Sequence, residues 1–133
     1  MWANRLVTQA STGDDPENYY LGGPYALRGW DRRMIHGTKT LYAQSEIRFP
    51  ILARTRLGAP LPMEFPRVNV ALFADAALAG EFGQPFNHLG AVGAGLFVGG
   101  GFFPIMRLDF VKRTDLRHLE AKTRTQFSIG YMF

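Results

Sequence analysis

The chain has 133 residues, a formal net charge of +4 and no cysteine. This length favours a single domain, and the lack of cysteine excludes disulfides, catalytic thiols and thiolate metal sites. No run approaches the roughly 18 consecutive apolar residues that indicate a transmembrane helix. The basic residues are scattered rather than clustered, so we expect no nucleic-acid partner.

The first predicted strand covers residues 2–10, where the two faces differ. Trp2 and Leu6 fall on one face and Arg5 falls on the other, because alternate residues of a strand point to opposite sides.

A long irregular segment, residues 11–37, follows this strand. Its glycines and prolines, including the run Gly22-Gly23-Pro24, predict turns rather than regular structure. A stretch of this length without strands or helices is usually functional or disordered. We therefore treat it as a candidate functional loop.

The second predicted strand, residues 38–49, has one mainly apolar face and one polar face. The apolar face comprises Leu41, Ala43, Ser45, Ile47 and Phe49, and the polar face comprises Tyr42, Gln44, Glu46 and Arg48. Side chains such as Glu46 and Arg48 need water or partners. We expect Pro50 to end this strand and residues 51–66 to form a turn with no strand of its own.

Three further strands follow, with the same alternation. They are predicted at residues 68–78, 89–98 and 104–112. Asp75 lies in the middle of the first, between apolar neighbours, which favours a buried partner for its carboxylate. Gly93 and Gly95 share one face of the second, and glycine inside a strand often marks the close approach of another backbone. Arg107 and Asp109 share one face of the third.

The last predicted strand, residues 124–133, carries an aromatic pattern. Phe127, Ile129, Tyr131 and Phe133 alternate with Ser128, Gly130 and Met132. One face is therefore wholly apolar or aromatic. Lipid covers such a face in a transmembrane β-barrel, whereas the alternative is the terminal strand of a soluble β-sandwich.

Together these patterns predict an all-β fold: about six antiparallel strands of a transmembrane β-barrel segment. Long connections at residues 11–37, 80–88 and 113–122 alternate with a short glycine turn at 99–101, as loops and turns do at the two rims of such barrels. The connection at 51–66 is longer than this pattern requires.

Catalytic motifs are absent from the sequence. We find no nucleophile elbow, no phosphate-binding glycine loop and no carboxylate pair with a supporting base. The three histidines, His36, His88 and His118, lie in or beside predicted loops without metal-ligand spacing. We therefore expect no enzymatic activity, no metal site and no cofactor.

Two segments resemble a known family. They are Tyr20-Leu21-Gly22-Gly23-Pro24-Tyr25-Ala26-Leu27-Arg28-Gly29-Trp30 and Glu46-Ile47-Arg48-Phe49-Pro50. Both look like the C-terminal barrel region of the bacterial surface antigen superfamily, which includes BamA-type assembly factors, TamA-type proteins and two-partner-secretion transporters. The sixth extracellular loop of that family carries an Arg-Gly-aromatic tip, matched here by Arg28, Gly29 and Trp30.

The resemblance continues in sequence order to the end of the chain. A later family strand carries a Phe-x-Asp-x-Gly pattern, matched here at Phe73 and Asp75 with Ala77 in the place of the glycine. The remaining matches are Gly93-Ala94-Gly95, Arg107-Leu108-Asp109-Phe110 and the closing aromatic strand.

This resemblance implies a place in the fold and a site. The chain would supply the last six strands, residues 1–133, of a roughly 16-stranded barrel. The loop at 11–37 would fold into the lumen, with Arg28 meeting Asp75 and with Glu46 on the same lumenal face. Gly29 would permit a tight turn, and Trp30 would wedge against the wall. Room for the loop tip would come from Gly93 and Gly95.

The closing strand, 124–133, would also carry the assembly-targeting signal of outer-membrane proteins. Its members are Phe127, Ile129, Gly130, Tyr131 and Phe133.

The implied function is the insertion or secretion of proteins at the bacterial outer membrane. Expected partners are outer-membrane lipid, client outer-membrane or secreted proteins, and the remaining barrel strands, from the same longer chain or from copies of it. The N-terminal residues lack the features of a signal peptide, so we expect either a mature chain or the tail of a longer protein. Two alternatives remain: a barrel that anchors or exports a separate domain, and a soluble β-sandwich binding module.

Overall fold

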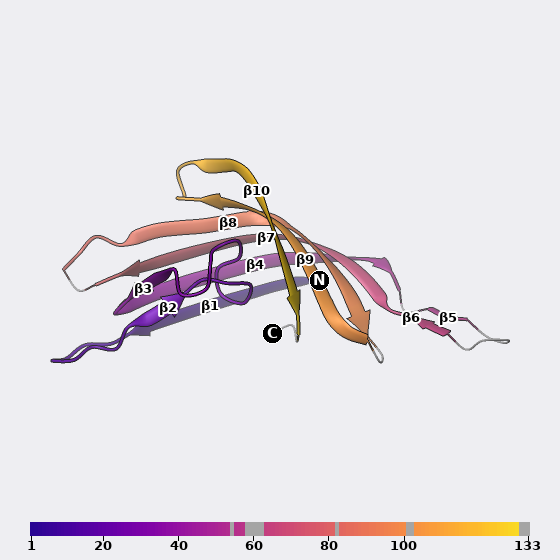
Figure 1. Ribbon diagram of the computed structural model, residues 1–133, viewed down its shortest axis with the longest axis horizontal. Coiled ribbons are helices and arrows are strands. Elements are labelled where there is room, and N and C mark those ends of the chain that lie inside the picture. The colour runs from indigo at the N-terminus through magenta and orange to yellow at the C-terminus, as the bar shows by residue number, and fades with distance from the viewer. Residues whose placement is uncertain (54, 58–62, 82, 101–102, 131–133) are drawn as a thin grey trace.

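The main body of the protein is one antiparallel sheet of six strands, seen in the computed structural model (Figure 1). The structure describes residues 1–53, 55–57, 63–81, 83–100 and 103–130. The six strands are β1 (Trp2–Ala10), β4 (Lys39–Leu52), β7 (Arg67–Gly80), β8 (Asn87–Gly100), β9 (Phe103–Thr114) and β10 (Leu119–Ile129). Neighbours in the sheet are neighbours in this order along the chain. Within the described residues all regular structure is β, which confirms the all-β, antiparallel prediction.

The predicted strands correspond one for one to these six, with some shifted ends. β1 has the predicted bounds, whereas β4 continues beyond Pro50, where we expected it to end. The ladder to β7 shifts register between Pro50 and Leu52, and such an irregularity is one of the few places where a sheet tolerates proline. β10 begins five residues before the predicted closing strand of residues 124–133 and ends at Ile129.

Two small hairpins correct the sequence-based expectation. The segment at residues 11–37 contains β2 (Tyr19–Leu21) paired with β3 (Ile35–Gly37), and the supposed turn at 51–66 contains β5 (Thr55–Leu57) paired with β6 (Met63–Phe65). Three residues are too few to show a period of two, so these strands left no signal in the sequence. In Figure 1 β2 and β3 lie along the main sheet, whereas β5 and β6 project beyond its other end.

Other connections are also shorter than predicted. β9 continues to Thr114 and β10 starts at Leu119, so the charged stretch at 113–122 is mostly strand. β8 likewise runs through Gly100, into the predicted turn at 99–101.

The two faces of the main sheet differ in what covers them. The segment at residues 11–37 packs on one face, which we call the covered face; the opposite one is the open face (Figure 1). On β4 the residues buried on the covered face are Thr40, Tyr42, Gln44, Glu46 and Arg48, as predicted for one common face. On the open face Leu41, Ile47 and Phe49 are exposed. Glu46 and Arg48 are therefore buried, whereas Leu41, Ile47 and Phe49 of the same strand are accessible.

A small apolar core joins the segment at 11–37 to the covered face. Its buried members are Leu21, Leu27, Ile35, Tyr42, Ala77 and Ala79, and Val7, Trp30 and Leu89 pack against them. Leu27 is fully buried. Ala77, which stands where the family pattern has glycine, is a member of this core, so its methyl group packs beneath the segment rather than keeping it away.

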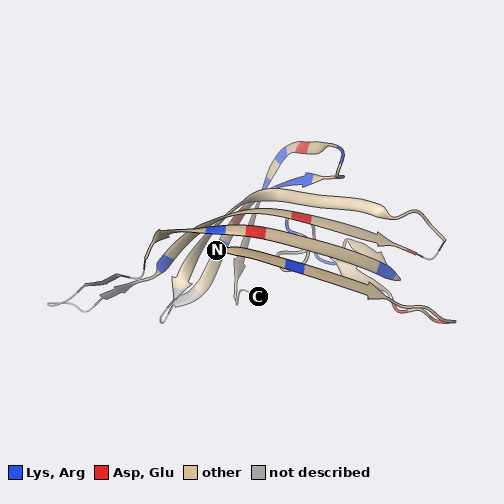
Figure 2. Cartoon of the chain, turned by 180° about the vertical axis from the view of Figure 1, so that it is seen from behind, with Lys and Arg blue, Asp and Glu red and all other residues tan. Residues whose placement is uncertain are grey.

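The sheet is open rather than closed. In the described part of the chain β1 pairs only with β4 and β10 pairs only with β9, so each presents one unpaired edge. Figure 2 shows how few Lys, Arg, Asp and Glu positions interrupt the long strands, and β8 has none. No helix within the described ranges has the length and apolar content to cross a membrane.

Candidate functional site: a buried arginine–carboxylate cluster

The segment at residues 22–30 is a compact lobe that presents Arg28 to the sheet. Gly23 N donates to Trp30 O at 2.8 Å, and Trp30 N donates to Leu27 O at 3.3 Å, which closes the lobe. Gly29 has a φ of 78°, a left-handed conformation that favours glycine. Arg28 emerges from this lobe with only 1% of its surface exposed.

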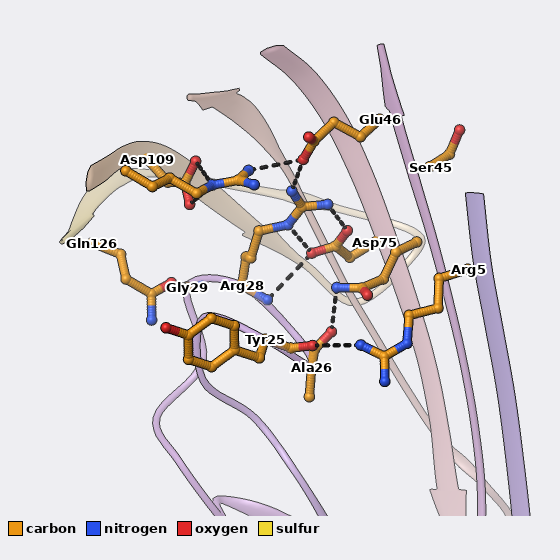
Figure 3. A network of polar contacts seen from close by, with 12 residues as sticks. Arg5, Tyr25, Ala26, Arg28, Gly29, Ser45, Glu46, Asp75, Asp109 and Gln126 are labelled. Carbon is orange, nitrogen blue, oxygen red and sulfur yellow. Dashed lines mark hydrogen bonds and ion pairs between the residues drawn. The ribbon is translucent and has the colours of Figure 1, made fainter. Parts of the chain in front are cut away.

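Arg28 forms ion pairs with two carboxylates on neighbouring strands (Figure 3). Its Nε donates to Asp75 Oδ2 at 2.6 Å, its Nη2 pairs with Asp75 Oδ1, and its Nη1 pairs with Glu46 Oε2. The backbone N of Arg28 also donates to Asp75 Oδ2, at 3.3 Å. This two-pronged geometry uses the planar fork of the guanidinium, which matches a carboxylate. The structure thus brings together Arg28, Asp75 and Glu46, three predicted site residues.

Two more arginines and a third carboxylate extend the cluster. Arg107 Nη2 donates to Glu46 Oε2 at 2.9 Å, and its Nε donates to both oxygens of Asp109, at 2.7 and 2.6 Å. Arg48 pairs with the other oxygen of Glu46. Glu46 therefore bridges Arg28, Arg48 and Arg107. Three guanidinium groups meet three carboxylates, and their formal charges balance.

Aromatic rings support the guanidinium groups of this cluster. The Arg28 Cζ lies 3.7 Å from the centroid of the Phe73 ring, and the Arg107 Cζ lies 4.2 Å from that of Phe97. Contacts at these distances are favourable cation–π interactions, stronger where the cation is desolvated. Both rings are buried on the covered face.

Gly93 and Gly95 make room for side chains of the cluster. A Cβ on Gly93 would lie 2.2 Å from the carbonyl oxygen of Phe110 and 2.7 Å from Phe73 Cζ, and a Cβ on Gly95 would lie 2.2 Å from Asp109 Oδ1. The expectation that the two glycines give the loop tip room stays a prediction. Their effect on the arginines of the cluster is indirect, because Phe73 stacks on Arg28 and Asp109 accepts hydrogen bonds from Arg107.

Gly29 is held between β9 and β10. Its N–H donates to Gln126 Oε1 at 3.0 Å, and its carbonyl accepts from Arg113 Nε at 2.6 Å. A Cβ at Gly29 would lie 2.6 Å from Val111 Cγ1, so the close approach excludes a larger residue. The predicted tight turn at Gly29 is present, and its contacts tie the lobe to strands that follow it by more than 80 residues.

Trp30 packs at the edge of the apolar core, against the wall formed by β8 and β9. Its Nε1 donates to the carbonyl of Gly90 at 3.0 Å, and the Arg113 guanidinium stacks over its ring at 4.5 Å. The side chain therefore contacts the strands, as the expected wedge would.

The closing strand contacts the lobe through Tyr25. The Tyr25 hydroxyl donates to the carbonyl of Ile129 at 3.2 Å, and the N–H of Gly130 donates to Ile105 O at 3.0 Å. Phe127 and Ile129 point to the open face and are 58% and 57% exposed. The predicted members Tyr131 and Phe133 lie outside the described residues.

Electrostatics favours a permanently charged Arg28. Burial acts to lower the pKa of its guanidinium, but the hydrogen bonds and charges of Asp75 and Glu46 outweigh burial and raise that pKa. Because each of the three carboxylates accepts hydrogen bonds from arginine, the cluster is suited to holding the segment in place. Among the described residues no group of three or more His, Asp or Glu side chains is placed to hold a metal ion.

Several members of the site could not be assigned from the sequence. Arg48, Arg107 and Asp109 were placed on the inner face by alternation, but nothing in the sequence predicted that they share Glu46. The lobe contacts made by Gln126 and Arg113 were missed as well. One signal in the sequence could have indicated these residues: charged side chains are concentrated at the positions of β4 and β9 that point to the covered face.

Comparison with known proteins adds no family assignment, since no family model, curated protein or solved structure matches this chain.

Proposed function

We propose that this chain is the C-terminal part of an outer-membrane β-barrel of the surface antigen superfamily, which assists the insertion or secretion of proteins. The observation that carries the proposal is the reversed burial of the six-stranded sheet. Large apolar side chains on the open face are accessible, while the charged side chains buried in the sheet lie on the covered face: Glu46, Arg48, Asp75, Arg107 and Asp109. Hydrocarbon outside and polar groups inside are the arrangement of a membrane barrel.

The open face supports a lipid-facing wall because its apolar residues extend over all six strands. Those exposed by more than a third are Trp2, Leu6, Leu41, Ile47, Phe49, Leu72, Val92, Leu96, Phe110, Phe127 and Ile129. Soluble monomers rarely expose contiguous apolar patches of more than a few hundred Å², so an apolar face that extends over six strands favours contact with lipid.

In a membrane, the unpaired edges of β1 and β10 would have to pair with further strands. In hydrocarbon an unpaired backbone N–H or C=O costs several kcal/mol, so an open edge is not viable there. We propose that strands of the same longer chain, or of further copies, pair with these edges and close the barrel to about 16 strands.

Inside that barrel the arginine–carboxylate cluster would anchor the segment at 11–37 in the lumen. The charge-assisted bonds of Arg28 to Asp75 and Glu46 join this segment to β4 and β7, and Gly29 joins it to β9 and β10. The segment therefore bridges strands along most of the sheet. We propose that it sets the shape of the pore and the spacing of the wall.

A topology experiment tests the membrane proposal. Because the chain has no cysteine, a single introduced cysteine is the only site for a thiol-reactive label. Spin labels would be attached to Leu72→Cys on the open face and, as a control, to Glu17→Cys in the exposed segment. After reconstitution into vesicles, the label at 72 should collide with oxygen and be shielded from an aqueous nickel complex, and the label at 17 should show the opposite. Equal nickel access at both positions, or full solubility of the protein without detergent, would support a soluble β-sandwich instead.

The assembly role is tested separately. Vesicles that contain the complete barrel with this segment should fold a urea-denatured client barrel faster than empty vesicles do. Equal folding rates would contradict the assembly role while leaving the membrane location intact.

A further inference from the structure

A groove of about 530 Å³ lies on the open face of the sheet, away from the arginine–carboxylate cluster. Its volume falls within the range of roughly 300–1,000 Å³ that is usual for ligand pockets. Small side chains form its floor and larger ones its walls. The floor comprises Ala43, Ser45, Ala74 and Ala76, and the walls comprise Leu6, Val92, Thr114 and Leu116.

The strand register produces this hollow. Ala43 is paired with Leu6 on one side and with Ala76 on the other, and Ser45 is paired with Ala74. Small residues thus meet across β4 and β7, while larger ones stand on β1 and β8. The depression runs across neighbouring strands instead of being an isolated gap.

One wall of the groove is held in an unusual conformation. Leu116, in the β9–β10 turn, has a φ of 66°, which is uncommon for a residue other than glycine. A Cβ on Gly90 would lie 2.9 Å from Leu116 Cδ2 and 2.9 Å from Thr114 Cγ2. Gly90 therefore leaves the space into which the Leu116 side chain folds, against the open face.

The interior of the groove suits an apolar ligand. The hydroxyl of Ser45, its polar floor group, accepts a hydrogen bond from Trp2 Nε1 at 3.0 Å. The side chains of Arg5, Gln44 and Asp75, which also border the groove, belong to the covered face. The remaining polar side chains are those of Asn4 and of Thr114, whose hydroxyl donates to His118 O at 2.8 Å. A chain of methylene groups fits such a lining, whereas a polar ligand would lose its hydrogen bonds with water.

Two basic residues, Lys112 and Arg117, neighbour Thr114 and Leu116, the groove walls at the β9–β10 turn. Lys112 is paired with Val92 in the ladder and shares the open face with Thr114, and Arg117 follows Leu116. Within the described residues no ion pair engages either cation. The nearby acids are already occupied: Asp115 accepts the N–H groups of Arg117 and His118, and Glu120 pairs with Arg124 at 3.1 Å.

We infer that this groove binds one acyl chain of an anionic phospholipid, with the phosphate beside Lys112 and Arg117. This inference rests on the proposed function, because the open face meets lipid in a membrane barrel. Long basic side chains near the end of a strand extend toward the headgroup region, so the apolar groove and the two cations match the two parts of such a lipid.

Native mass spectrometry of the complete barrel with phosphatidylglycerol and phosphatidylcholine tests the inference. The wild-type protein should retain phosphatidylglycerol preferentially. Ala74→Phe fills the floor and should abolish retention, whereas the matched control Ala94→Phe adds the same ring on the open face outside the groove and should retain lipid normally. Removing both charges, Lys112→Gln with Arg117→Gln, should weaken the preference roughly fivefold or more for each cation.

Three outcomes would overturn the inference: equal retention in Ala74→Phe and wild type, equal loss in Ala94→Phe, or disulfide-linked dimers of Ala74→Cys, which would assign the groove to a second copy. If Ala74→Phe does not fold, Leu116→Ala removes a wall instead and should reduce retention.

Flotation with vesicles separates the two proposals. If every variant floats but lipid retention is the same in all of them, the groove proposal is wrong and the membrane proposal stands. If the wild-type protein does not float, the membrane proposal fails as well.

Discussion

The two faces of this sheet differ in the side chains they carry and in how exposed those side chains are. The covered face holds three arginines and three carboxylates away from solvent and satisfies them with one another and with aromatic rings. The open face leaves large side chains such as Leu72 accessible, and its strands carry small residues where the groove lies. Alternation in the sequence therefore identifies the two faces of a strand. Which face is buried depends on which other segments of the molecule pack against it.

The largest expected effect comes from removing the arginine that links the segment at 11–37 to the covered face. Arg28→Ala would leave Asp75 buried without its bidentate partner and Glu46 with one cation fewer. Breaking a buried ion pair in this way costs about 3–5 kcal/mol. We expect a loss of that size in urea unfolding and a lower temperature for the heat-modifiability transition.

The matched control for Arg28→Ala is Arg32→Ala, an exposed arginine of the same segment. Surface substitutions of this kind usually change stability by less than about 0.5 kcal/mol. Wild-type behaviour of Arg28→Ala would show that the cluster does not hold the segment.

The next largest effect tests the open face. Leu72→Lys places a charge in the middle of β7, on a side chain that is 53% exposed. In a bilayer this should cost about 2–4 kcal/mol, whereas at an exposed site in water it should be nearly neutral. Folding into vesicles at increasing urea concentration measures the difference.

Leu78→Lys provides the control near the end of the same strand, where a charge should cost only about 0–1 kcal/mol. Equal effects at positions 72 and 78 would argue against a membrane across this face.

A smaller effect is expected from adding one methyl group to the covered face. Gly95→Ala would bring a Cβ within 2.2 Å of Asp109 Oδ1. Overpacking of this kind costs about 1–3 kcal/mol, and the displaced carboxylate would also disturb Arg107. Ala94→Val, the neighbouring residue on the open face, should unfold at the same urea concentration as wild type. If Gly95→Ala is equally harmless, the packing of the cluster is looser than its geometry indicates.

The smallest effect concerns pH at the β9–β10 turn. Backbone N–H groups of His118 and Arg117 lower the pKa of Asp115 below its ordinary value. A carboxyl group with a lowered folded-state pKa stabilises the turn above its unfolded pKa of about 3.9, and this contribution is lost as pH falls through the lower folded value. The protection factors of the amides of residues 117 and 118, which compare their exchange rates with those of an unfolded chain at the same pH, should therefore fall in acid in the wild-type protein. Asp115→Asn should remove that dependence, and an unchanged acid response in this variant would assign it to another group.

Most of the sheet could be predicted from the sequence because long strands repeat their alternating pattern. Fourteen residues of alternation in β4 and in β7 leave little doubt about which residues share a face. The hairpins β2–β3 and β5–β6 escaped detection, since strands of three residues show no period. Pro50 misled the expectation for β4 because the local rule against proline in a ladder gave way to an irregular register.

By itself, the sequence determined the six strands and their two faces, and the resemblance added the expectation that Arg28 meets Asp75. Only the tertiary structure decided that Glu46 serves three arginines, that Gly93 and Gly95 accommodate Phe73 and Asp109, and that Gly29 lies between β9 and β10. The physical reason is that side-chain direction follows from the local backbone period, whereas contacts between different strands, up to 97 positions apart along the chain, depend on strand register and on how the segment at 11–37 folds over the sheet.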